Sequence, residues 1–420
     1  MNAPRERMDA RDAAREVALR LKEAGHRALF AGGCVRDRLM GFEPKDFDIA
    51  TGATPEDIMR AFPKSRGVGE AFGVMLVRHG GHTFEVATFR KDGPYLDGRR
   101  PSTVHFSDER EDALRRDFTV NGIFEEPETG EPVDYVDGRN DIAARLIRAI
   151  GDPHARIAED RLRMLRAVRF AARLGFEIEA ATGDAIRAHA GELKSVSPER
   201  VGEEIRKMLA HRARERAAGL AESQLLDGAV FGERAATAEF LRLHALPEPA
   251  AWTTAVAAWY LDRMANGSRV PRPDARTRAE AVAKLRRNLV LSNDETDAIA
   301  AALAVRESLH AGFAARPLAA RKRTMAQAGF DAALEIVRAE APELAAAIAS
   351  EAARELPERR LPEPLVDGNA LLGEGLKAGP AFKMLLDQAM DAQLERRVAT
   401  RAEALELVRN LLRTPSGGGA

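Results

Sequence analysis

Two acidic side chains near the start of the chain, Asp46 and Asp48, could together hold a metal ion. They alternate with the apolar residues Phe47 and Ile49. Because successive side chains of a β-strand point to opposite faces, we expect both carboxylates on one face of a strand and both apolar side chains on the other. Neighbouring carboxylates are typical Mg²⁺ ligands in enzymes that transfer phosphate-containing groups.

Two adjacent glycines, Gly32 and Gly33, precede these carboxylates and follow an apolar run at 28–31. The apolar run is typical of a buried strand, and residues 35–40 have a helical pattern. Glycines between a strand and a helix let the backbone turn sharply and approach a ligand, while the first N–H groups of the helix would point towards an anion. The stretch at 32–48 therefore predicts a phosphate cradle beside two carboxylates, as nucleotidyl transfer with two Mg²⁺ requires.

A third acid, Glu85, lies in a predicted β-hairpin. Residues 72–77 and 82–88 have strand character and are separated by a glycine pair, which is typical of a hairpin turn. Glu85 is either a third carboxylate that faces the metal ions or a solvent-facing acid.

A second polar group, Arg115-Arg116-Asp117, is followed four residues later by Asn121. Paired guanidinium groups followed by Asp and Asn can hold a triphosphate and a ribose hydroxyl. The preceding stretch at 91–101 is rich in Gly, Pro and Arg, which predicts either a mobile loop that contacts phosphate or a simple surface loop.

From Asp141 onward the hydrophobic period is helical, which places a domain boundary near 140–150. We predict one helix over 159–170, with Asp160 followed by a row of arginines at three-residue spacing: Arg163, Arg166 and Arg169. Another helix begins after Ser197, and Ser292 with Glu295 forms a capping box. A Pro-rich break at 356–364 separates a final helical unit, and the Gly-rich end after Thr414 is predicted to be disordered.

Composition limits the classes of protein. The 420 residues suffice for about two to four domains. Without an apolar run of about 18 residues or a signal peptide, the chain is expected to be soluble and intracellular, with no membrane partner. The single cysteine, Cys34, excludes an intramolecular disulfide and a Cys-based zinc site, and we expect it to be buried. A net charge of −1 gives no global basic signal for nucleic acid, although local arginine clusters could still bind phosphates. The few aromatic residues argue against a base-stacking platform and for recognition by shape and phosphate.

Four motifs in this order resemble those of the bacterial class II CCA-adding enzymes, the tRNA nucleotidyltransferases, and bacterial poly(A) polymerases share much of the pattern. The motifs are Gly-Gly-x-Val-Arg-Asp with Asp46-x-Asp48, Arg-Arg-Asp-Phe-Thr-Val-Asn at 115–121, Glu-Asp-x-x-Arg at 159–163, and Ser-x-Glu-Arg-x-x-x-Glu at 197–204. The resemblance is dense over 25–210 and thin beyond. It implies template-independent addition of C, C and A to the 3′ end of tRNA from CTP and ATP, in the cytoplasm, with Mg²⁺ as cofactor and release of pyrophosphate.

The resemblance also implies an α+β fold. A polymerase-β-like nucleotidyltransferase head with a five-stranded mixed sheet would be followed by all-helical neck, body and tail domains. The implied boundaries are 1–145 for the head, 146–210 for the neck that recognises the base, 211–355 for the body, 356–414 for the tRNA-binding tail and 415–420 for a disordered end.

The resemblance implies a role for each motif residue. Gly33, next to Gly32, and Arg36 would contact the nucleotide phosphates, and Asp46 and Asp48 would bind Mg²⁺. Glu85 is the candidate for a third metal ligand that the hairpin pattern adds to this set. Arg116 would contact the nucleotide and Asp117 the ribose, beside Asn121. Asp160 and Arg163 would read the base, with Arg166 and Arg169 nearby. The loop at 95–101 matches loosely a mobile loop that helps the family switch from C to A.

Base reading by one acid and one guanidinium also has a chemical argument. Cytosine and adenine both present an amino donor beside a ring-nitrogen acceptor, whereas uracil and guanine present an acceptor beside an N–H. Asp160 can accept from the amino group while Arg163 donates to the ring nitrogen. A wrong base would mismatch both side chains, at a cost of about 1–3 kcal/mol by analogy with base-edge readout. The alternative is a surface ion pair along one helix.

Other functions fit parts of the pattern. The runner-up is a poly(A) polymerase, or a relative that adds only CC or only A. Poly(A) polymerases of this family usually carry an Arg-Arg-Phe stretch where this chain has residues 66–72, which favours CCA addition. A small-molecule nucleotidyltransferase would not need the additional helical residues. A non-catalytic RNA-binding relative would not need Asp46 and Asp48.

Overall fold

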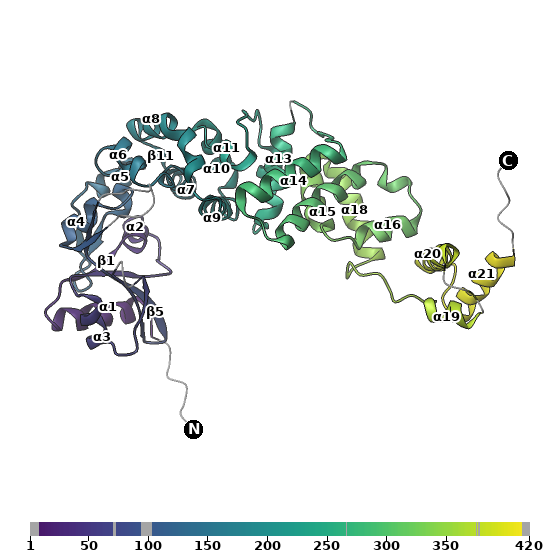
Figure 1. The fold of residues 1–420 in the computed structure, drawn as a ribbon, viewed down its shortest axis with the longest axis horizontal. Helices are drawn as coiled ribbons and strands as arrows, with labels where there is room; N and C mark the ends of the chain where they lie inside the picture. The colour runs from purple at the N-terminus through teal and green to yellow at the C-terminus, as the bar shows by residue number, and fades with distance from the viewer. Residues whose placement is uncertain are drawn as a thin grey trace, which may run out of the picture. The chain divides into compact units, whose positions relative to one another are not determined.

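The computed structural model describes residues 8–69, 73–93, 103–265, 267–374, 376 and 379–413 (Figure 1). The predicted mobile loop at 95–101 and the predicted disordered end at 415–420 lie outside the described residues. Residues 70–72 also lie outside them; they end the stretch 66–72, which stands where poly(A) polymerases usually carry Arg-Arg-Phe.

The chain divides into two compact units. The first comprises residues 1–236 together with 288–290, and the second comprises 237–287 and 291–420. Head and neck motifs therefore belong to one unit. The four-domain boundaries stay predictions, since the division into two units coincides with none of them.

The first unit is built on a mixed sheet in the order β3-β4-β5-β2-β1-β8-β9, in which only the β2–β5 pair is parallel among the described strands. The mixed sheet was predicted, but with five strands. The structure has seven because two short strands, β8 and β9, extend the sheet beside β1. The strands are β1 (Ala28–Ala31), β2 (Asp48–Thr51), β3 (Arg66–Gly69), β4 (Val74–His79), β5 (His82–Thr88), β8 (Phe124–Glu125) and β9 (Pro132–Val133).

Two helices, α1 (Ala10–Glu23) and α3 (Pro55–Ala61), cover one face of this sheet (Figure 1). Their apolar side chains form one buried cluster with strand residues such as Ile49 and Val86. Thr54 and Asp57 close a capping box that begins α3. Because neighbouring residues of a strand alternate between faces, burial of Ile49 and Val86 turns the residues before them to the other face.

The rest of the first unit is mainly helical. A two-stranded hairpin and short elements precede the neck: α2 (Gly33–Leu39), β6 (Arg90–Asp92), β7 (Val104–Phe106), α4 (Glu109–Leu114), the 3₁₀ turn η2 (Thr119–Asn121) and α5 (Gly138–Ala144). The neck and its continuation contain β10 (Leu146–Ile147), α6 (Pro153–Glu159), α7 (Arg163–Leu174), β11 (Glu177–Ile178), α8 (Ala180–His189), η3 (Ala190–Ser195), α9 (Pro198–Leu209), α10 (Arg214–Ser223) and α11 (Gly228–Phe231).

Two predictions for the neck need correction. The neck is not entirely helical, because β10 and β11 pair as short parallel strands. The predicted continuous helix over 159–170 is interrupted: α6 ends at Glu159, Asp160 has an extended backbone (φ −146°), and α7 begins at Arg163. Asp160 and Arg163 therefore do not share a helix face.

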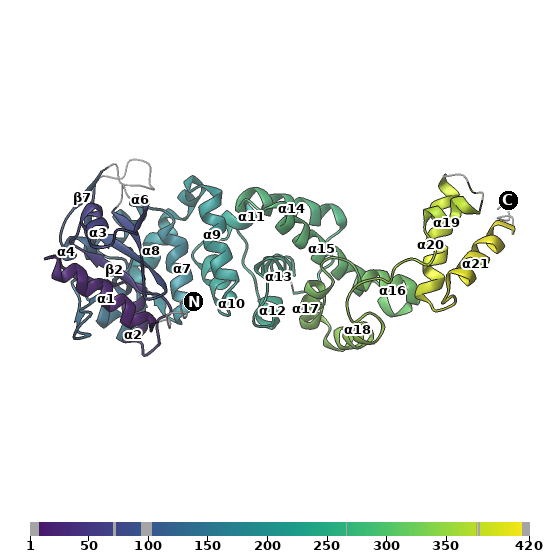
Figure 2. The ribbon, with the colours of Figure 1, turned by 90° about the horizontal axis from the view of Figure 1, so that it is seen from below.

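In its described residues, the second unit has helices and no strand. Its elements are α12 (Leu241–Ala245), α13 (Trp252–Met264), α14 (Ala275–Leu289, whose last residues belong to the first unit), α15 (Asn293–His310), η4 (Phe313–Ala315), α16 (Leu318–Met325), α17 (Phe330–Glu340), α18 (Pro342–Glu355), α19 (Gly368–Gly373), α20 (Pro380–Leu394) and α21 (Arg401–Arg413). The predicted capping box of Ser292 and Glu295 begins α15. Helix α17 packs against both α15 and α18 around one apolar cluster (Figure 2), and α19–α21 form another.

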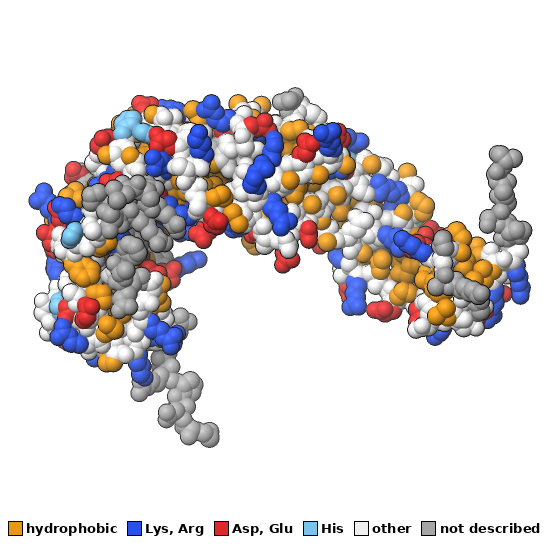
Figure 3. Space-filling model, in the orientation of Figure 1, with side chains coloured by type: hydrophobic (Ala, Val, Ile, Leu, Met, Phe, Trp, Pro, Cys, Tyr) orange, Lys and Arg blue, Asp and Glu red, His pale blue; other side chains and the backbone are white. Residues whose placement is uncertain are grey.

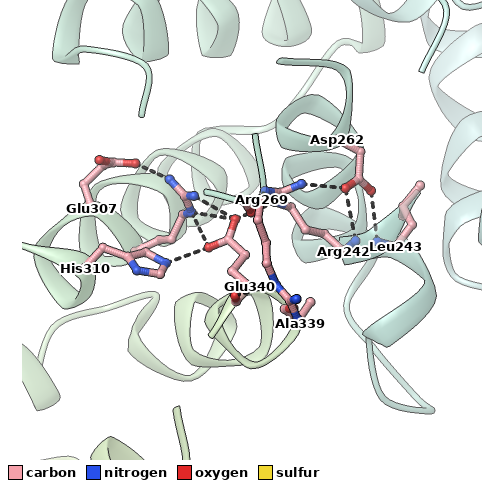
Figure 4. Close-up of polar contacts among 9 residues, drawn as sticks. Arg242, Leu243, Asp262, Arg269, Glu307, His310, Ala339 and Glu340 are labelled. Carbon is pink, nitrogen blue, oxygen red and sulfur yellow. Dashed lines mark hydrogen bonds and ion pairs between the residues drawn. The ribbon is translucent and has the colours of Figure 1, made fainter. Parts of the chain in front are cut away.

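A network of buried charges crosses the core of the second unit (Figure 4). Glu340 accepts hydrogen bonds from Arg242 and from Arg306 (Nη2 to Oε1, 2.7 Å), and its Oε2 lies 2.7 Å from Nε2 of His310. Arg242 also donates to Asp262 (2.9 Å). Burial alone raises the pKa of Glu340, but the hydrogen bonds from His310 and Arg306 and the arginine charges outweigh it and lower that pKa. Each buried charge is thus compensated by the opposite one.

Two predictions from composition can be compared with the structure. Cys34 is buried, as predicted, and burial raises the pKa of its thiol to about 11. Within the described ranges, no helix combines the length and the apolar character needed to cross a membrane. Acidic and basic side chains are interspersed on the face drawn in Figure 3, in keeping with the net charge of −1.

Candidate active site

The two predicted metal-binding carboxylates lie on one face of the sheet. Phe47 and Ile49 are buried, whereas Asp46 and Asp48 are exposed. The parallel pairing of Ile49 with Val86 sets Glu85 beside Asp48 on the same, exposed face. The alternation predicted from spacing is therefore present.

The carboxylates influence one another electrostatically. The pKa of Asp48 is raised to about 6. The larger cause is partial desolvation of its carboxylate, and the nearby negative charges of Glu85 and Asp46 add to it. Arg116 acts in the opposite direction. A cation placed among these oxygens would relieve the repulsion and displace the proton from Asp48.

The donor set fits Mg²⁺. Carboxylate oxygens are its preferred protein ligands, and it usually takes only one or two of them, with phosphate oxygens and water at its other positions. Within the described residues, no three His, Cys, Asp or Glu side chains form one metal-binding group. Metal binding by Asp46 and Asp48 stays a prediction, as does the role of Glu85 as a third ligand.

The glycine turn next to the carboxylates has a steric reason. Gly32 has a left-handed backbone (φ +70°) and immediately precedes α2, which begins at Gly33. A Cβ atom on Gly32 would lie 3.2 Å from Nη1 of Arg116. Glycine thus serves both the turn and the close approach of the arginine.

Arg36 lies in the site, but its guanidinium points into the protein. The residue is only 3% exposed. Its Nη1 donates to Oδ1 of Asn121 (2.6 Å), and its Nε and Nη2 donate to Asp37. The contact between Arg36 and the nucleotide phosphates stays a prediction, and it requires the guanidinium to give up one of these partners. Arg36 joins α2 to the segment that carries Asn121.

A buried carboxylate that sequence reasoning missed, Asp112, holds the arginine pair. Asp112 is 1% exposed and accepts hydrogen bonds from Arg115 (2.8 Å) and Arg116 (2.9 Å). Burial alone would raise the pKa of Asp112, but the two guanidinium groups outweigh it and lower that pKa. The i, i+3 and i, i+4 spacing from Asp112 to the two arginines was the available signal.

Asp117 connects the head segment to the neck. Its Oδ2 accepts two hydrogen bonds from Arg166 (2.6 and 2.8 Å), and its Oδ1 accepts from Asn121 (3.1 Å) and from the amide of Phe118. Burial acts to raise its pKa, but the Arg166 charge and these hydrogen bonds lower it overall. Both oxygens thus have protein partners, and the contact of Asp117 with the ribose stays a prediction.

Asp160 and Arg163 do not form a helical ion pair with each other. Asp160 accepts from Arg200 (2.8 Å) and from the amide of Leu162, whereas Arg163 donates to Glu159 (2.6 Å) and to a backbone carbonyl. The alternative of a simple surface pair along one helix is therefore wrong. Base reading by these two side chains stays a prediction, and it requires both to release some protein partners to the base.

The remaining arginine of the predicted row, Arg169, pairs with buried Glu204 at 2.5 Å. Burial lowers the pKa of Arg169, and the charge of Glu204 offsets part of that effect. Each arginine of the row thus binds a different carboxylate. Arg163 binds Glu159 of α6, Arg166 binds Asp117 before η2, and Arg169 binds Glu204 of α9. The partners Glu159 and Glu204 belong to motifs that the sequence analysis quoted, but their pairing was not predicted.

Comparison with known proteins agrees with this arrangement. Residues 28–148 match the poly A polymerase head domain family, and residues 175–229 match the family described as a probable RNA and SrmB-binding site of polymerase A. The CCA-adding enzyme of Bacillus pumilus is 44% identical over 198 residues, which are 47% of this chain and 49% of that protein. The enzyme of Geobacillus stearothermophilus is 45% identical over 194 residues, 46% and 48% of the two chains. The chain thus aligns with about half the length of these curated relatives.

Solved structures extend the similarity. The crystal structure of the Bacillus stearothermophilus CCA-adding enzyme in complex with CTP matches with a TM-score of 0.78 and 30% identity, covering 97% of this chain and all of that one. The Thermotoga maritima CCA-adding enzyme complexed with tRNA shares the fold, with a TM-score of 0.69, 18% identity and 97% coverage of both chains. The first unit therefore has the head of the poly(A) polymerase class. Because the similarity at 30% identity spans the whole of a solved relative, the chain belongs to the family of CCA-adding enzymes.

Proposed function

We propose that the protein is a cytoplasmic nucleotidyltransferase that adds C, C and A to the 3′ end of tRNA from CTP and ATP, with Mg²⁺ as cofactor and pyrophosphate as the leaving group. The observation that carries this proposal is the pair of exposed carboxylates, Asp46 at the entry to β2 and Asp48 at its first residue, near the Gly32 turn. Relatives of this family are called CCA-adding enzymes, and solved members are complexes with CTP and with tRNA.

Asp46 and Asp48 would hold the metal ions. When bound, Mg²⁺ supplies charge stabilisation and lowers the pKa of the attacking RNA 3′-hydroxyl. Arg116, held by Asp112 and the carbonyl of Asn121, offers a fixed positive charge near Asp48 for the nucleotide phosphates. No side-chain nucleophile is required, because the RNA hydroxyl attacks the α-phosphate directly and pyrophosphate leaves.

Three residues serve to position this machinery. Arg36 and Asp117 meet at the two ends of the Asn121 side-chain amide, and Asp117 in turn holds Arg166 of α7. This chain of charge-assisted hydrogen bonds joins α2 to α7. It therefore fixes the distance between the proposed phosphate cradle at the start of α2 and the proposed base-reading residue Arg163 at the start of α7. Its residues act through one another rather than on the substrate.

The proposed activity is tested by incubating the protein with a tRNA transcript that lacks its last three nucleotides, with each NTP singly and with all pairs. We expect two additions with CTP alone, completion to CCA with CTP and ATP together, and none with UTP or GTP. Continued A addition to the transcript would indicate a poly(A) polymerase. Arrest after CC would indicate a relative that adds only CC, and addition of A only to tRNA ending in CC would indicate a relative that adds only A. No product with any combination would refute the nucleotidyl-transfer proposal.

Base selection should depend on Asp160. Replacing it with Ala removes the acceptor for the amino group of C or A, so the preference for CTP over UTP is expected to fall by a factor equivalent to about 1–3 kcal/mol. Single-turnover rates with CTP and UTP measure this ratio. Arg200→Ala is the comparison variant, because it removes the arginine partner of Asp160 and keeps the carboxylate itself. It should therefore reduce the preference for CTP over UTP less than Asp160→Ala does. An unchanged CTP-to-UTP ratio in Asp160→Ala would place base reading elsewhere.

A further inference from the structure

Helix α7 carries a fourth arginine beyond the row in the candidate site. Arg163, Arg166, Arg169 and Arg173 are spaced by three, three and four residues, so they follow one side of the helix. The first three each bind a carboxylate. Arg173 is exposed, and in the described part of the chain it has no hydrogen bond or ion pair. The row therefore ends in a positive charge that the protein does not neutralise.

Arg173 lines a cavity of about 210 Å³ between α7, α9 and the start of α10. Two other cationic side chains line it, from Arg169 and Lys207, with small and apolar residues between them. His211 lines it as well, and Nδ1 of its ring accepts a hydrogen bond from the amide of Ala213. One carboxylate, that of Glu204, contacts two of them: Arg169 at 2.5 Å and Lys207 at 3.7 Å. The lining thus keeps an excess of positive charge, which suits a phosphate group.

The position of the cavity along α7 relates it to the candidate active site. Ten residues separate Arg163 from Arg173, and at 1.5 Å per residue they lie about 15 Å apart along the helix. A stacked nucleic-acid strand advances about 3.4 Å per nucleotide, so this distance corresponds to about four nucleotides. Resting on the proposed function, the geometry points to a subsite for a backbone phosphate of the RNA substrate, a few nucleotides before the 3′ end, with Arg173 and Lys207 as its direct contacts.

The test compares RNA binding and nucleotide use in Arg173→Ala and Lys207→Ala. Each is expected to weaken binding of truncated tRNA about three- to tenfold at low salt and to reduce the log–log salt slope by about 0.7–0.9. The KM for CTP and the kcat at saturating RNA should stay unchanged, and Arg173→Lys should restore most of the affinity. Arg60→Ala is the matched control, because Arg60 is 78% exposed on α3, which covers the opposite face of the sheet.

A second measurement identifies the ligand. Methylphosphonate substitution at single positions of the RNA removes one phosphate charge at a time. One position within the last few nucleotides should weaken binding to the wild type but not to Arg173→Ala. Unchanged RNA affinity and salt slope in both variants would overturn the subsite. Altered inhibition by inorganic pyrophosphate with unchanged RNA binding would overturn it too, by showing a site for free pyrophosphate. The RNA affinity, the salt slope and the methylphosphonate effect need no turnover, so failure of the subsite is distinguishable from failure of nucleotide addition itself.

Discussion

Asp46→Asn and Asp48→Asn are each expected to reduce nucleotide addition on the order of 10³-fold or more, because each removes a charge from the metal-binding pair while preserving shape. Both carboxylates are exposed, so the substitutions should leave the fold intact. Single-turnover addition of CTP at saturating Mg²⁺ measures the effect. Binding of truncated tRNA should stay within about twofold of the wild type, because the proposed phosphate subsite lies elsewhere, at Arg173 and Lys207.

Glu56→Gln provides the control for these variants. Glu56 is an exposed acid in the first turn of α3, on the side of the sheet away from Asp46 and Asp48. Removing its charge should leave the rate unchanged. Glu85→Gln tests the third carboxylate: a loss comparable to that of Asp48→Asn would make Glu85 a metal ligand, whereas a small effect would make it a neighbour that only shifts the pKa of Asp48. Near-normal turnover in Asp46→Asn or Asp48→Asn would refute the metal assignment.

The largest stability effect is expected from Glu340→Gln. Glu340 is 2% exposed and compensates Arg242 and Arg306, which are as deeply buried. Removing its charge takes a carboxylate partner away from two buried guanidinium groups, which should lower the free energy of unfolding by about 3–5 kcal/mol. Denaturant unfolding of the full chain, followed by helical circular dichroism, should show a lower midpoint for the transition of the second unit.

Glu343→Gln is the matched variant on the neighbouring helix. Glu343 lies in the first turn of α18 and is exposed, so its loss should change stability by less than about 0.5 kcal/mol. Replacing Glu340 and Arg306 together should cost less than the sum of the single changes, because the pair is removed as a unit. If Glu340→Gln unfolded at the same denaturant concentration as Glu343→Gln, the network in Figure 4 would not support the core.

Local physics explains which parts of the fold were predictable. The alternation of Asp46 and Asp48 with Phe47 and Ile49 follows from the two-residue period of a strand. The glycine turn at Gly32 and the caps at Thr54 and Ser292 follow from contacts within three or four residues. The short strand β8 and the pair β10–β11 escaped prediction because two-residue strands have no detectable period, whereas β9 overlaps the end of a strand that the sequence places at 133–136.

The sequence by itself determined the alternation that exposes Asp46 and Asp48, the glycine turn and the family, because each depends on the order of neighbouring residues. Only the tertiary structure decided the partners of the arginines. Arg36 could equally bind a phosphate or a carboxylate, and its choice of Asn121, 85 residues away, depends on how α2 packs. Asp117 and Arg166 are 49 residues apart, and Asp160 and Arg200 are 40 apart. Spacing along the chain carries no information about such pairs, since a charged side chain accepts any partner of opposite charge that folding brings within reach.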